Sequence, residues 1–560
     1  MARKRIGDLL HEAGVLTAGQ LQEALRIQEQ TRERLGDVLI NHGMISEKQL
    51  MEVLEFQLGI PRVSIVKERL DPATLALVPD HMARRYVVLP LRRERNRLVV
   101  AMADPLDYYA IDDLRIATGF PISPAIAAKD ELRNFIERYY GMKESLGQAL
   151  QSVAANTAAE PADAELVDDN SPIVRLVNQI LAQAVKDRAS DVHFDGGSDH
   201  VQVRFRVDGV LRPGQSLPKD LQSMVTARVK IVAGLDISER RLPQDGRFRT
   251  AVDGREIDVR VSTLPTLYGE KVVLRILDQR TGVLNLDRLS FSPMHLRAVQ
   301  DMLAAPSGMV LVTGPTGSGK TSTLYAALQE CNTPAVNIVT IEDPVEYQLP
   351  GINQVAVNMS TGLSFAAGLR SILRQDPDIV MVGEIRDRET AEIATRAALT
   401  GHLVLSTLHT SGAVESVARL TDMGIEPFLV ASALSGVIAQ RLVRRVCPDC
   451  RQAHTPSQTE WDWIRKVWGD DATREADAHF AVGDGCGACG HTGYRGRVAV
   501  HELVRVDEPL RRMILDGAPE AQVRAYTAQR GFATLLADGL EKAAGGVTTL
   551  AEVVRVAWRE

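Results

Sequence analysis

Residues 309–321 read Met-Val-Leu-Val-Thr-Gly-Pro-Thr-Gly-Ser-Gly-Lys-Thr, an apolar run that passes directly into a glycine-rich segment. The glycine-rich part, Gly314 to Thr321, matches the pattern GxxxxGK[ST], and a segment with helical character begins at Ser322. In the order strand, loop, helix, such a loop wraps phosphate oxygens with backbone N–H groups at a helix N-terminus. The sequence therefore predicts a nucleoside triphosphate site on an α/β sheet.

The glycine-rich loop supplies most of the expected contacts to the nucleotide. Lys320 is expected to reach the β- and γ-phosphates, and the Thr321 hydroxyl is expected to bind Mg²⁺. The predicted ATP-binding residues are Gly314, Pro315, Thr316, Gly317, Ser318, Gly319, Lys320 and Thr321.

Three further apolar runs end in polar residues, and they span 337–342, 378–384 and 402–409. Because the carboxyl ends of parallel strands line a ligand crevice, Glu342, Glu384 and His409 are expected to converge on the γ-phosphate. Hydrolysis needs a carboxylate for Mg²⁺ or its waters, a group that orients the attacking water and a group that senses the phosphate. We assign Glu384 to water activation and Glu342 to the metal or its water shell, with the reverse assignment open. Lys320 and His409 complete the predicted catalytic set.

Four segments of this region carry a family resemblance: 313–321, 341–346, 373–387 and 400–410. They resemble the Walker A, Asp box, Walker B and His box of the secretion and pilus ATPases, over about residues 171–560. The resemblance implies a RecA-like motor that forms a homo-hexameric ring on the inner face of the cytoplasmic membrane. It also implies an inner-membrane platform protein as partner, and pilin or pseudopilin polymerisation as the work done. Arg370, Arg374 and Arg386 fall in these boxes and either contact phosphates across subunits or form surface ion pairs.

Four of the five cysteines form two CxxC pairs, Cys447/Cys450 and Cys486/Cys489. In a cytosolic chain this pattern favours a metal over disulfides, and four thiolates suit tetrahedral Zn²⁺. A redox dithiol is the weaker alternative because no thioredoxin-like context precedes either pair. We predict a structural zinc module at about 445–497. The resemblance adds that such an insertion is typical of assembly and secretion motors and is absent from the shorter retraction motors.

An internal repeat opens the chain. Arg5-Ile-Gly-Asp-Leu-Leu reappears as Arg34-Leu-Gly-Asp-Val-Leu, and the correspondence continues to Gln28 and Gln57. Each unit reads as a short helix, a glycine C-cap and a second helix that begins with a capping box, Thr17-x-x-Gln20 in the first unit and Ser46-x-x-Gln49 in the second. A small helical packing unit explains the leucines, but it does not explain why Arg and Gln repeat as well.

A paired ligand explains the repeated polar residues better. Arg binds guanine O6 and N7 with both arms, and helix N-termini suit phosphate. The two motifs run from 5 to 28 and from 34 to 57, and they resemble the tandem cyclic-di-GMP-binding motif of some pilus and secretion ATPases, with Ile6 as a mild departure. The resemblance implies binding of cyclic-di-GMP by Arg5, Gly7, Gly14, Gln28, Arg34, Gly36, Gly43 and Gln57.

The fold class predicted from these features is a multidomain α/β protein: a helical tandem-repeat domain, small α/β modules, and a RecA-like motor with a zinc-binding insertion. The predicted boundaries are 1–60 for the repeat region, 61–145 for a small α/β module, 146–170 for a flexible linker, 171–285 for an α/β domain before the motor, and 286–560 for the motor. Segments of 171–285 resemble the domain that precedes the motor in secretion ATPases. The resemblance implies that its arginines can reach a neighbour's phosphates, and the candidates are Arg204, Arg206 and Arg241.

Composition limits the other functions. The chain has 560 residues, 45% hydrophobic and 24% charged, which is ordinary for a soluble protein of three or four domains. It has neither an apolar run long enough for a membrane span nor a signal-peptide core, so we expect a cytoplasmic protein that meets the membrane only through partners. The net charge of −7 speaks against a second candidate, a nucleic-acid motor. A third candidate is a cyclic-di-GMP-controlled scaffold with little ATP turnover.

Overall fold

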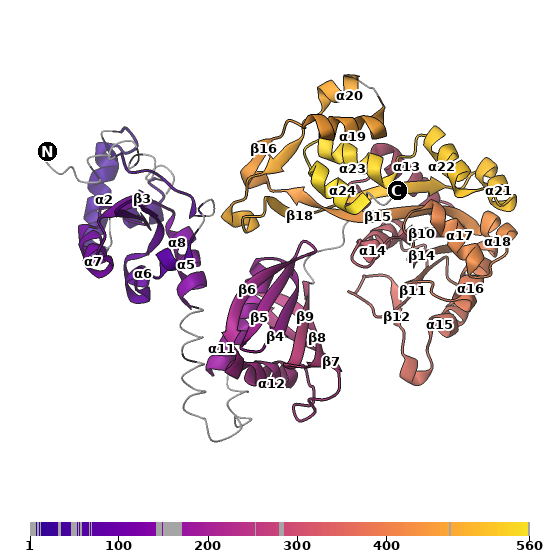
Figure 1. Ribbon diagram of the computed structural model, residues 1–560, viewed down its shortest axis with the longest axis horizontal. Coiled ribbons are helices and arrows are strands. Elements are labelled where there is room, and N and C mark those ends of the chain that lie inside the picture. The colour runs from indigo at the N-terminus through magenta and orange to yellow at the C-terminus, as the bar shows by residue number, and fades with distance from the viewer. Residues whose placement is uncertain are drawn as a thin grey trace.

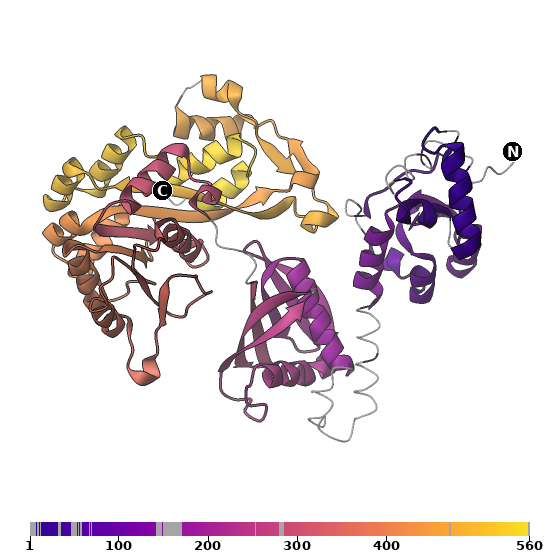
Figure 2. The same ribbon diagram turned by 180° about the vertical axis from the view of Figure 1, so that it is seen from behind.

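The protein is described here from a computed structural model. The structure describes residues 7, 10–11, 13–31, 35–45, 53, 55, 59–65, 68, 70–141, 148, 171–252, 254–278, 285–469 and 472–557. Almost all of the predicted linker, 146–170, lies outside these residues, as do Arg5, Arg34 and Gln57. Figures 1 and 2 show the chain from two opposite sides.

The first repeat forms the helix expected after its glycine cap. Helix α2 spans Ala18–Thr31, and α3 of the second repeat spans Leu35–Asn41. The capping box at the start of α2 is present, since the Gln20 amide donates to Thr17 Oγ1 at 3.3 Å and the Thr17 amide donates to Gln20 Oε1 at 3.0 Å. Gly14 and Gly43 both adopt positive φ angles, 72° and 66°, as a helix C-cap requires. The second capping box, at Ser46, lies outside the described residues.

The next module is a three-stranded sheet with helices. Strand β2 pairs antiparallel with β1 and parallel with β3. The elements are α5 (Pro72–Leu75), α6 (Asp80–Tyr86), β1 (Val88–Glu94), β2 (Arg97–Met102), α7 (Tyr108–Thr118), β3 (Ile122–Ile126) and α8 (Lys129–Ile136). Almost every residue of β2 is buried, so this strand forms the centre of the module.

A six-stranded antiparallel sheet in the order β6-β5-β4-β9-β8-β7 forms the domain before the motor. Side chains alternate along β5, with Val201, Val203, Phe205 and Val207 buried and the polar residues between them on the other face. Helices α11 and α12 cover the apolar face (Figure 1). The elements are α11 (Pro172–Lys186), β4 (Ala189–Gly196), β5 (His200–Val207), β6 (Val210–Pro218), α12 (Gln222–Val232), β7 (Gln244–Val252), β8 (Arg255–Thr266) and β9 (Gly269–Asp278).

The motor is built on a seven-stranded sheet in the order β12-β11-β13-β14-β10-β15-β18, parallel except for β18. Its strands are β10 (Gly308–Thr313), β11 (Ile338–Glu342), β12 (Asn353–Ala356), β13 (Ile379–Val382), β14 (Leu403–Leu408), β15 (Leu434–Val446) and β18 (Tyr494–Arg505). The four apolar runs identified in the sequence are β10, β11, β13 and β14. These four strands run in parallel, so their carboxyl ends meet at one edge of the sheet.

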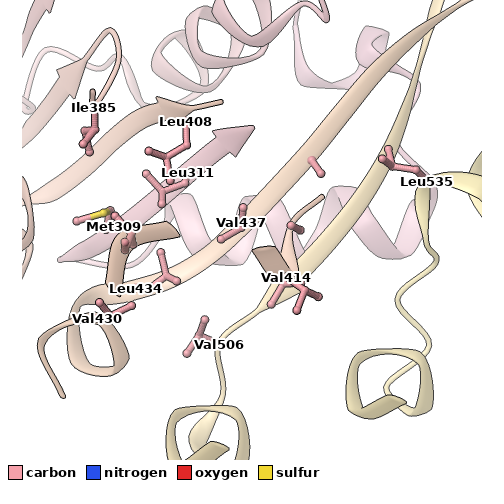
Figure 3. Close-up of a cluster of buried hydrophobic side chains, with 14 of the residues drawn as sticks. Met309, Leu311, Ile385, Leu408, Val414, Val430, Leu434, Val437, Val506 and Leu535 are labelled. Carbon is pink, nitrogen blue, oxygen red and sulfur yellow. The ribbon is translucent and has the colours of Figure 1, made fainter. Parts of the chain in front are cut away.

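Helices cover both faces of this sheet, which explains why β10 is apolar along its whole length. Met309 and Leu311 belong to one buried cluster, with Val437 of β15 (Figure 3), and Val310 and Val312 belong to the cluster on the opposite face. The helices are α13 (Pro293–Leu303), α14 (Lys320–Cys331), α15 (Phe365–Ile372), α16 (Arg388–Leu399), α17 (Val414–Asp422), α18 (Pro427–Ala433), α21 (Glu508–Leu515), α22 (Glu520–Gln529), α23 (Leu535–Ala544) and α24 (Leu550–Ala557).

The segment between β15 and β18 contains the four paired cysteines. Its elements are β16 (Arg451–Ala453), α19 (Gln458–Trp468), α20 (Ala472–Asp477) and β17 (Ala481–Gly483), and β16 pairs antiparallel with β17. None of the described helices combines the length and apolar composition that a membrane span requires.

Candidate functional site

The glycine-rich loop connects β10 to α14 and is shaped for phosphate. Gly314, Gly317 and Gly319 have φ angles of 150°, 78° and 88°, in a region that residues with a Cβ rarely adopt. The Lys320 ammonium donates to the carbonyls of Gly314 at 2.8 Å and Pro315 at 3.1 Å, so it curls over the loop. The Ser318 hydroxyl is buried without a hydrogen-bond partner among the described residues. These features fit a triphosphate, which would satisfy both the ammonium and the loop amides.

Gln440 of β15 hydrogen-bonds to this loop and to the helix that follows it. The sequence motifs did not reveal this role. Its side-chain amide donates to the Ser318 carbonyl at 2.8 Å, and its Oε1 accepts from the Thr323 hydroxyl at 2.6 Å. It is also packed so closely that a Cβ at Gly319 would lie 2.8 Å from its Nε2. No local pattern marks this glutamine, because its partners lie about 120 residues earlier in the chain.

The lysine lies in a charged but poorly hydrated environment. Burial lowers the pKa of Lys320 to about 8, while nearby Glu384 raises it and Arg441 lowers it. Arg441 follows Gln440 on β15, and its guanidinium would lie 3.0 Å from a Cβ placed on Gly314. A second cation therefore lies beside the phosphate loop, and it too was missed by motif reading.

Glu384 and His409 are brought together, as the ends of neighbouring parallel strands predicted. The Glu384 carboxylate accepts from Arg386 Nε at 2.6 Å and lies 3.4 Å from His409 Nε2. Hydroxyls between the strands hold these two turns in place, since Thr407 Oγ1 donates to the Gly383 carbonyl at 2.8 Å. Glu384 is thus a held carboxylate near Lys320, with a cation and an imidazole as its partners.

Glu342 has a different environment from the one that its place at a strand end suggested. Its carboxylate is 3% exposed and accepts hydrogen bonds from the Tyr325 hydroxyl, from Thr340 Oγ1 at 2.6 Å and from Gln354 Nε2 at 3.1 Å. The Tyr325 hydroxyl in turn accepts from the Glu346 amide at 3.2 Å. Three side chains therefore already bind the carboxylate oxygens and fix the position of Glu342 in the core.

The four paired cysteines form a compact centre. Their sulfur atoms all lie within 4.8 Å of one another, and the hydrogen-bonded sulfur pairs are 3.8 to 3.9 Å apart. Four sulfurs bound tetrahedrally at about 2.3 Å from zinc lie about 3.8 Å apart, so the thiolates fit this ion. Burial opposes ionisation of Cys489, but the amides of Cys486 and Gly493 donate to its sulfur and lower its pKa to about 7. Cys331, the fifth cysteine, lies apart with its pKa raised to about 11 by burial.

In the repeat region the structure separates packing residues from surface residues. Gly7 is explained by packing, because a Cβ there would lie 2.7 Å from Leu21 Cδ1. The face of α2 that carries Leu21, Leu25 and Gln28 is less buried than a core face, and Leu25 is 42% exposed. Helix α2 instead buries Ala24. If the repeat served only for packing, Leu25 would be expected to be buried.

The three candidate arginines of the preceding domain all have acidic neighbours in their own domain. Arg204 binds Asp195 at 2.7 Å, Arg206 binds Asp191 at 3.5 Å, and Arg241, 88% exposed, binds Glu239 at 3.0 Å. Arg241 lies on the loop between α12 and β7, away from the strands.

Strand register reveals an arginine row that the sequence did not suggest. Directly paired positions across the polar face are Arg247, Arg260, Arg275, Asp191 and Arg206. Like charges on directly opposite positions repel. Acids offset part of this repulsion, since Asp191 binds Arg206 and Arg275, and Glu346 of the motor binds Arg260 at 2.9 Å. Arg247, at the end of the row, is exposed and can meet an anionic partner.

Two parts of the chain match known protein families. Residues 166–555 match the family described as "Type II/IV secretion system protein", more than half of the chain. The chain belongs to this family. It is therefore a P-loop ATPase of the secretion family, and the predicted family, RecA-like fold class and enzyme class are confirmed. Residues 58–146 match the MshEN domain, so this module, in which we had recognised no chemistry, is itself a known domain type.

Relatives of this secretion-family ATPase include both pilus and secretion proteins. The type IV pilus assembly ATPase PilB of Myxococcus xanthus is 43% identical over 558 residues, 98% of each chain. The type II secretion system protein E of Xanthomonas campestris is 44% identical over 478 residues, 84% of this chain and 83% of that protein. The PilB protein of Thermus thermophilus is 44% identical over 503 residues, and the match spans only 56% of its length.

A solved structure agrees on the fold. The X-ray structure of the Legionella pneumophila ATPase DotB covers 69% of this secretion-family chain and 96% of its own, with a TM-score of 0.51 and 21% identity. At that identity the likeness describes the fold only.

Proposed function

We propose that this ATPase is a hexameric motor whose ATP hydrolysis drives pilin or pseudopilin polymerisation, in a type IV pilus or a type II secretion system, under control of cyclic-di-GMP. The observation that carries the proposal is the meeting of Lys320, Glu384 and His409 at one sheet edge, in a chain that aligns along 98% of its length with a pilus assembly ATPase.

The site residues divide the work of hydrolysis. Lys320 turns from its own loop carbonyls to the β- and γ-phosphates, and the Thr321 hydroxyl would hold Mg²⁺, which neutralises phosphate charge. Glu384 orients the attacking water and His409 senses the γ-phosphate through its contact with Glu384. Glu342, held by Tyr325, Thr340 and Gln354, acts through the position of its strand end. In this proposal Glu384 is the water-activating acid, and the reverse assignment to Glu342 is the alternative.

The ring explains the arginine row. Arginines on the polar face of the preceding domain, with Arg206 in the row and Arg204 and Arg241 beside it, face the nucleotide of an adjacent subunit. The ring works on an inner-membrane platform protein, which gives the ATPase a peripheral position at the cytoplasmic membrane. Nucleic acid is not expected as a partner, given the net charge of −7.

Zinc would bind to the four paired cysteines, Cys447, Cys450, Cys486 and Cys489. Its role would be structural, because all four coordination positions are protein thiolates.

Cyclic-di-GMP control rests on the repeat and on the domain that follows it. The repeat duplicates Arg, Gly and Gln positions, and the α2 face with Leu25 and Gln28 is open enough for a ligand. The MshEN match begins at residue 58, directly after the second motif ends at Gln57. The other residues proposed to bind cyclic-di-GMP are Arg5, Gly14, Arg34, Gly36 and Gly43. Gly7 is instead explained by its packing against Leu21.

The testing experiment is ATP hydrolysis by the purified hexameric fraction, with and without cyclic-di-GMP, beside Lys320→Ala. Turnover that needs Lys320 and changes with the dinucleotide supports the regulated motor. Turnover that ignores the dinucleotide keeps the motor and removes its control. Absence of turnover in a hexamer that still binds ATP favours the scaffold instead.

Dinucleotide binding has its own test. Arg34→Ala or Gln57→Ala is expected to weaken cyclic-di-GMP binding about tenfold or more, because a bidentate arginine contact with guanine is worth about 1–3 kcal/mol. Calorimetry measures this affinity, and ATP binding by the same variants serves as the control and should not change. Equal dinucleotide affinity in variant and parent would remove the assignment.

A further inference from the structure

The hairpin turn between β5 and β6, in the domain before the motor, contacts the cysteine centre of the motor in the same chain. The turn is Asp208-Gly209, with φ angles of 51° and 84°, the two-residue geometry that Asp-Gly favours. It faces residues 486–496, the second cysteine knuckle and the start of β18. Some 280 residues of sequence separate the two partners.

Three hydrogen bonds join the turn to the knuckle. Arg212 donates to the Cys489 carbonyl at 3.2 Å and to Thr492 Oγ1 at 3.4 Å. Asp208 Oδ2 accepts from the Gly496 amide at 2.8 Å. The guanidinium of Arg212 is half-buried at this contact, and burial lowers its pKa from the usual value. Charge-assisted bonds in a partly dry contact are stronger than neutral ones, so this is more than a chance approach of two surfaces.

The knuckle is shaped to receive the arginine. Gly490 has a φ angle of 60°, and a Cβ at this position would lie 3.0 Å from Arg212 Nη1. A glycine is therefore needed here both for the turn and for the approach of the guanidinium. The Thr492 hydroxyl also donates to the Cys489 carbonyl at 2.8 Å, which fixes the direction of the shared acceptor.

The arginine's acceptor depends on the metal centre. The Cys489 carbonyl belongs to a residue whose sulfur accepts from the Cys486 and Gly493 amides, 3.1 and 3.2 Å away. The regular structure of the loop 486–493 is one short 3₁₀ turn, Gly487–Cys489, and hydrogen bonds such as His491 N–H to the Cys486 carbonyl at 2.8 Å add to it. Zn²⁺ on the four thiolates would hold this loop, because small metal modules of this kind fold on their metal.

The same centre is attached rigidly to the phosphate loop. Strand β15 carries Gln440, which clamps Ser318, and seven residues later the chain reaches Cys447. At a rise of about 3.3 Å per residue, this stretch covers the roughly 23 Å between Gln440 and Cys447, the first of the four cysteines. The pairing of β15 with β18 stiffens this connection.

We propose that the metal-bound knuckle, residues 486–496, is the docking surface for the β5–β6 turn, and that zinc thereby fixes the domain before the motor against the motor of its own chain. The zinc module then acts as one joint between the two domains, in addition to the ion pair of Arg260 with Glu346 at 2.9 Å. This inference does not depend on what the motor moves.

Hydrogen exchange of the full-length protein, followed by mass spectrometry, tests the proposal. The variants are Arg212→Ala and Asp208→Gly, and glycine keeps the turn geometry while removing the carboxylate. The matched control is Arg465→Ala, because Arg465 binds Glu475 within the same insertion at 2.7 Å and lies outside both 204–214 and 486–496. Zinc content and exchange in the β10–β14 core are measured alongside, so that a misfolded variant is recognised.

In the zinc-loaded protein, Asp208→Gly is expected to raise exchange at Gly496 about fivefold, as loss of one net hydrogen bond implies, with zinc content unchanged. Removal of zinc by a chelator should raise exchange in 204–214 as well as in 486–496, and the Arg465 control should behave as the parent. Exchange in 204–214 that ignores zinc removal, or both variants matching the parent in 486–496, would overturn the proposal.

Discussion

At the scale of single residues, the charge on Lys320 is the most testable feature of the nucleotide site. Burial lowers its pKa to about 8, with an opposing effect of Glu384 and a supporting effect of Arg441. Phosphates bind the protonated ammonium and raise its pKa, so nucleotide binding takes up a proton once the free lysine has lost it. ATP affinity is therefore expected to be full below pH 8 and to fall about tenfold per pH unit above it.

Equilibrium binding of ATP between pH 7 and 9.5 measures this slope. Lys320→Arg is the control, because an arginine stays protonated throughout that range. The ATP affinity of this variant is expected to differ from that of the parent by a constant factor, with a flat pH profile. A slope shared by parent and variant would assign the titration to another group.

At the scale of elements, the network around Tyr325 joins helix α14 to the loop that follows β11. Tyr325 is fully buried, and its hydroxyl contacts Glu342 and accepts from the Glu346 amide. Tyr325→Phe keeps the ring but leaves a buried carboxylate short of one donor. We expect a loss of about 2 kcal/mol in the unfolding free energy of the motor, the range for hydrogen bonds to charged groups.

Urea unfolding followed by tryptophan fluorescence measures this loss, because Trp461, Trp463 and Trp468 all lie in the motor. Tyr347→Phe is the matched control, since its ring packs edge-on against Tyr325 at 4.6 Å while its hydroxyl takes no part in the Glu342 bonds described above. The control should unfold within about 0.5 kcal/mol of the parent, as typical for a mild substitution. Equal losses in both variants would show that the Tyr325 hydroxyl contributes no more than a tyrosine hydroxyl outside the Glu342 network, and would remove the role assigned to it.

At the scale of the whole molecule, the arginine row predicts cooperation between subunits. Arg247 is exposed at the end of the row and is directly paired with Arg260. Arg247→Ala alone is expected to lower ATP turnover at least about tenfold, because an arginine that stabilises transferring phosphate from a neighbour is worth that much or more. Mixing this variant with Lys320→Ala subunits restores sites in which an intact lysine meets an intact neighbouring arginine.

The measurement is the ATPase rate of mixed rings over a range of subunit ratios. A maximum at intermediate ratios, above the sum of the two separate rates, is the expected result. Arg495→Ala serves as a control that leaves the row intact. A rate that only interpolates between the two variants would place Arg247 in its own subunit's site, or outside the site.

Several features of this protein were determined by the sequence alone, because the residues that form them are close together in the chain. The phosphate loop, the four strands with polar ends and the CxxC pairs are local patterns, and each was found where it was predicted. The meeting of Glu384 with His409 was also foreseeable, since parallel strands bring their carboxyl ends together.

Other features were decided only by the tertiary structure. Glu342 stands at a strand end like Glu384, yet its carboxylate is held by Tyr325, Thr340 and Gln354. Gln440 binds the phosphate loop, and Arg212 of β6 binds the knuckle. Both have partners more than 100 residues away in the sequence. Such contacts depend on strand register and on which helix covers which face, and short motifs contain no information on either. Local patterns therefore predicted the chemistry of the site. Packing decided which of the predicted side chains, such as Glu342, are instead held by hydrogen bonds in the core.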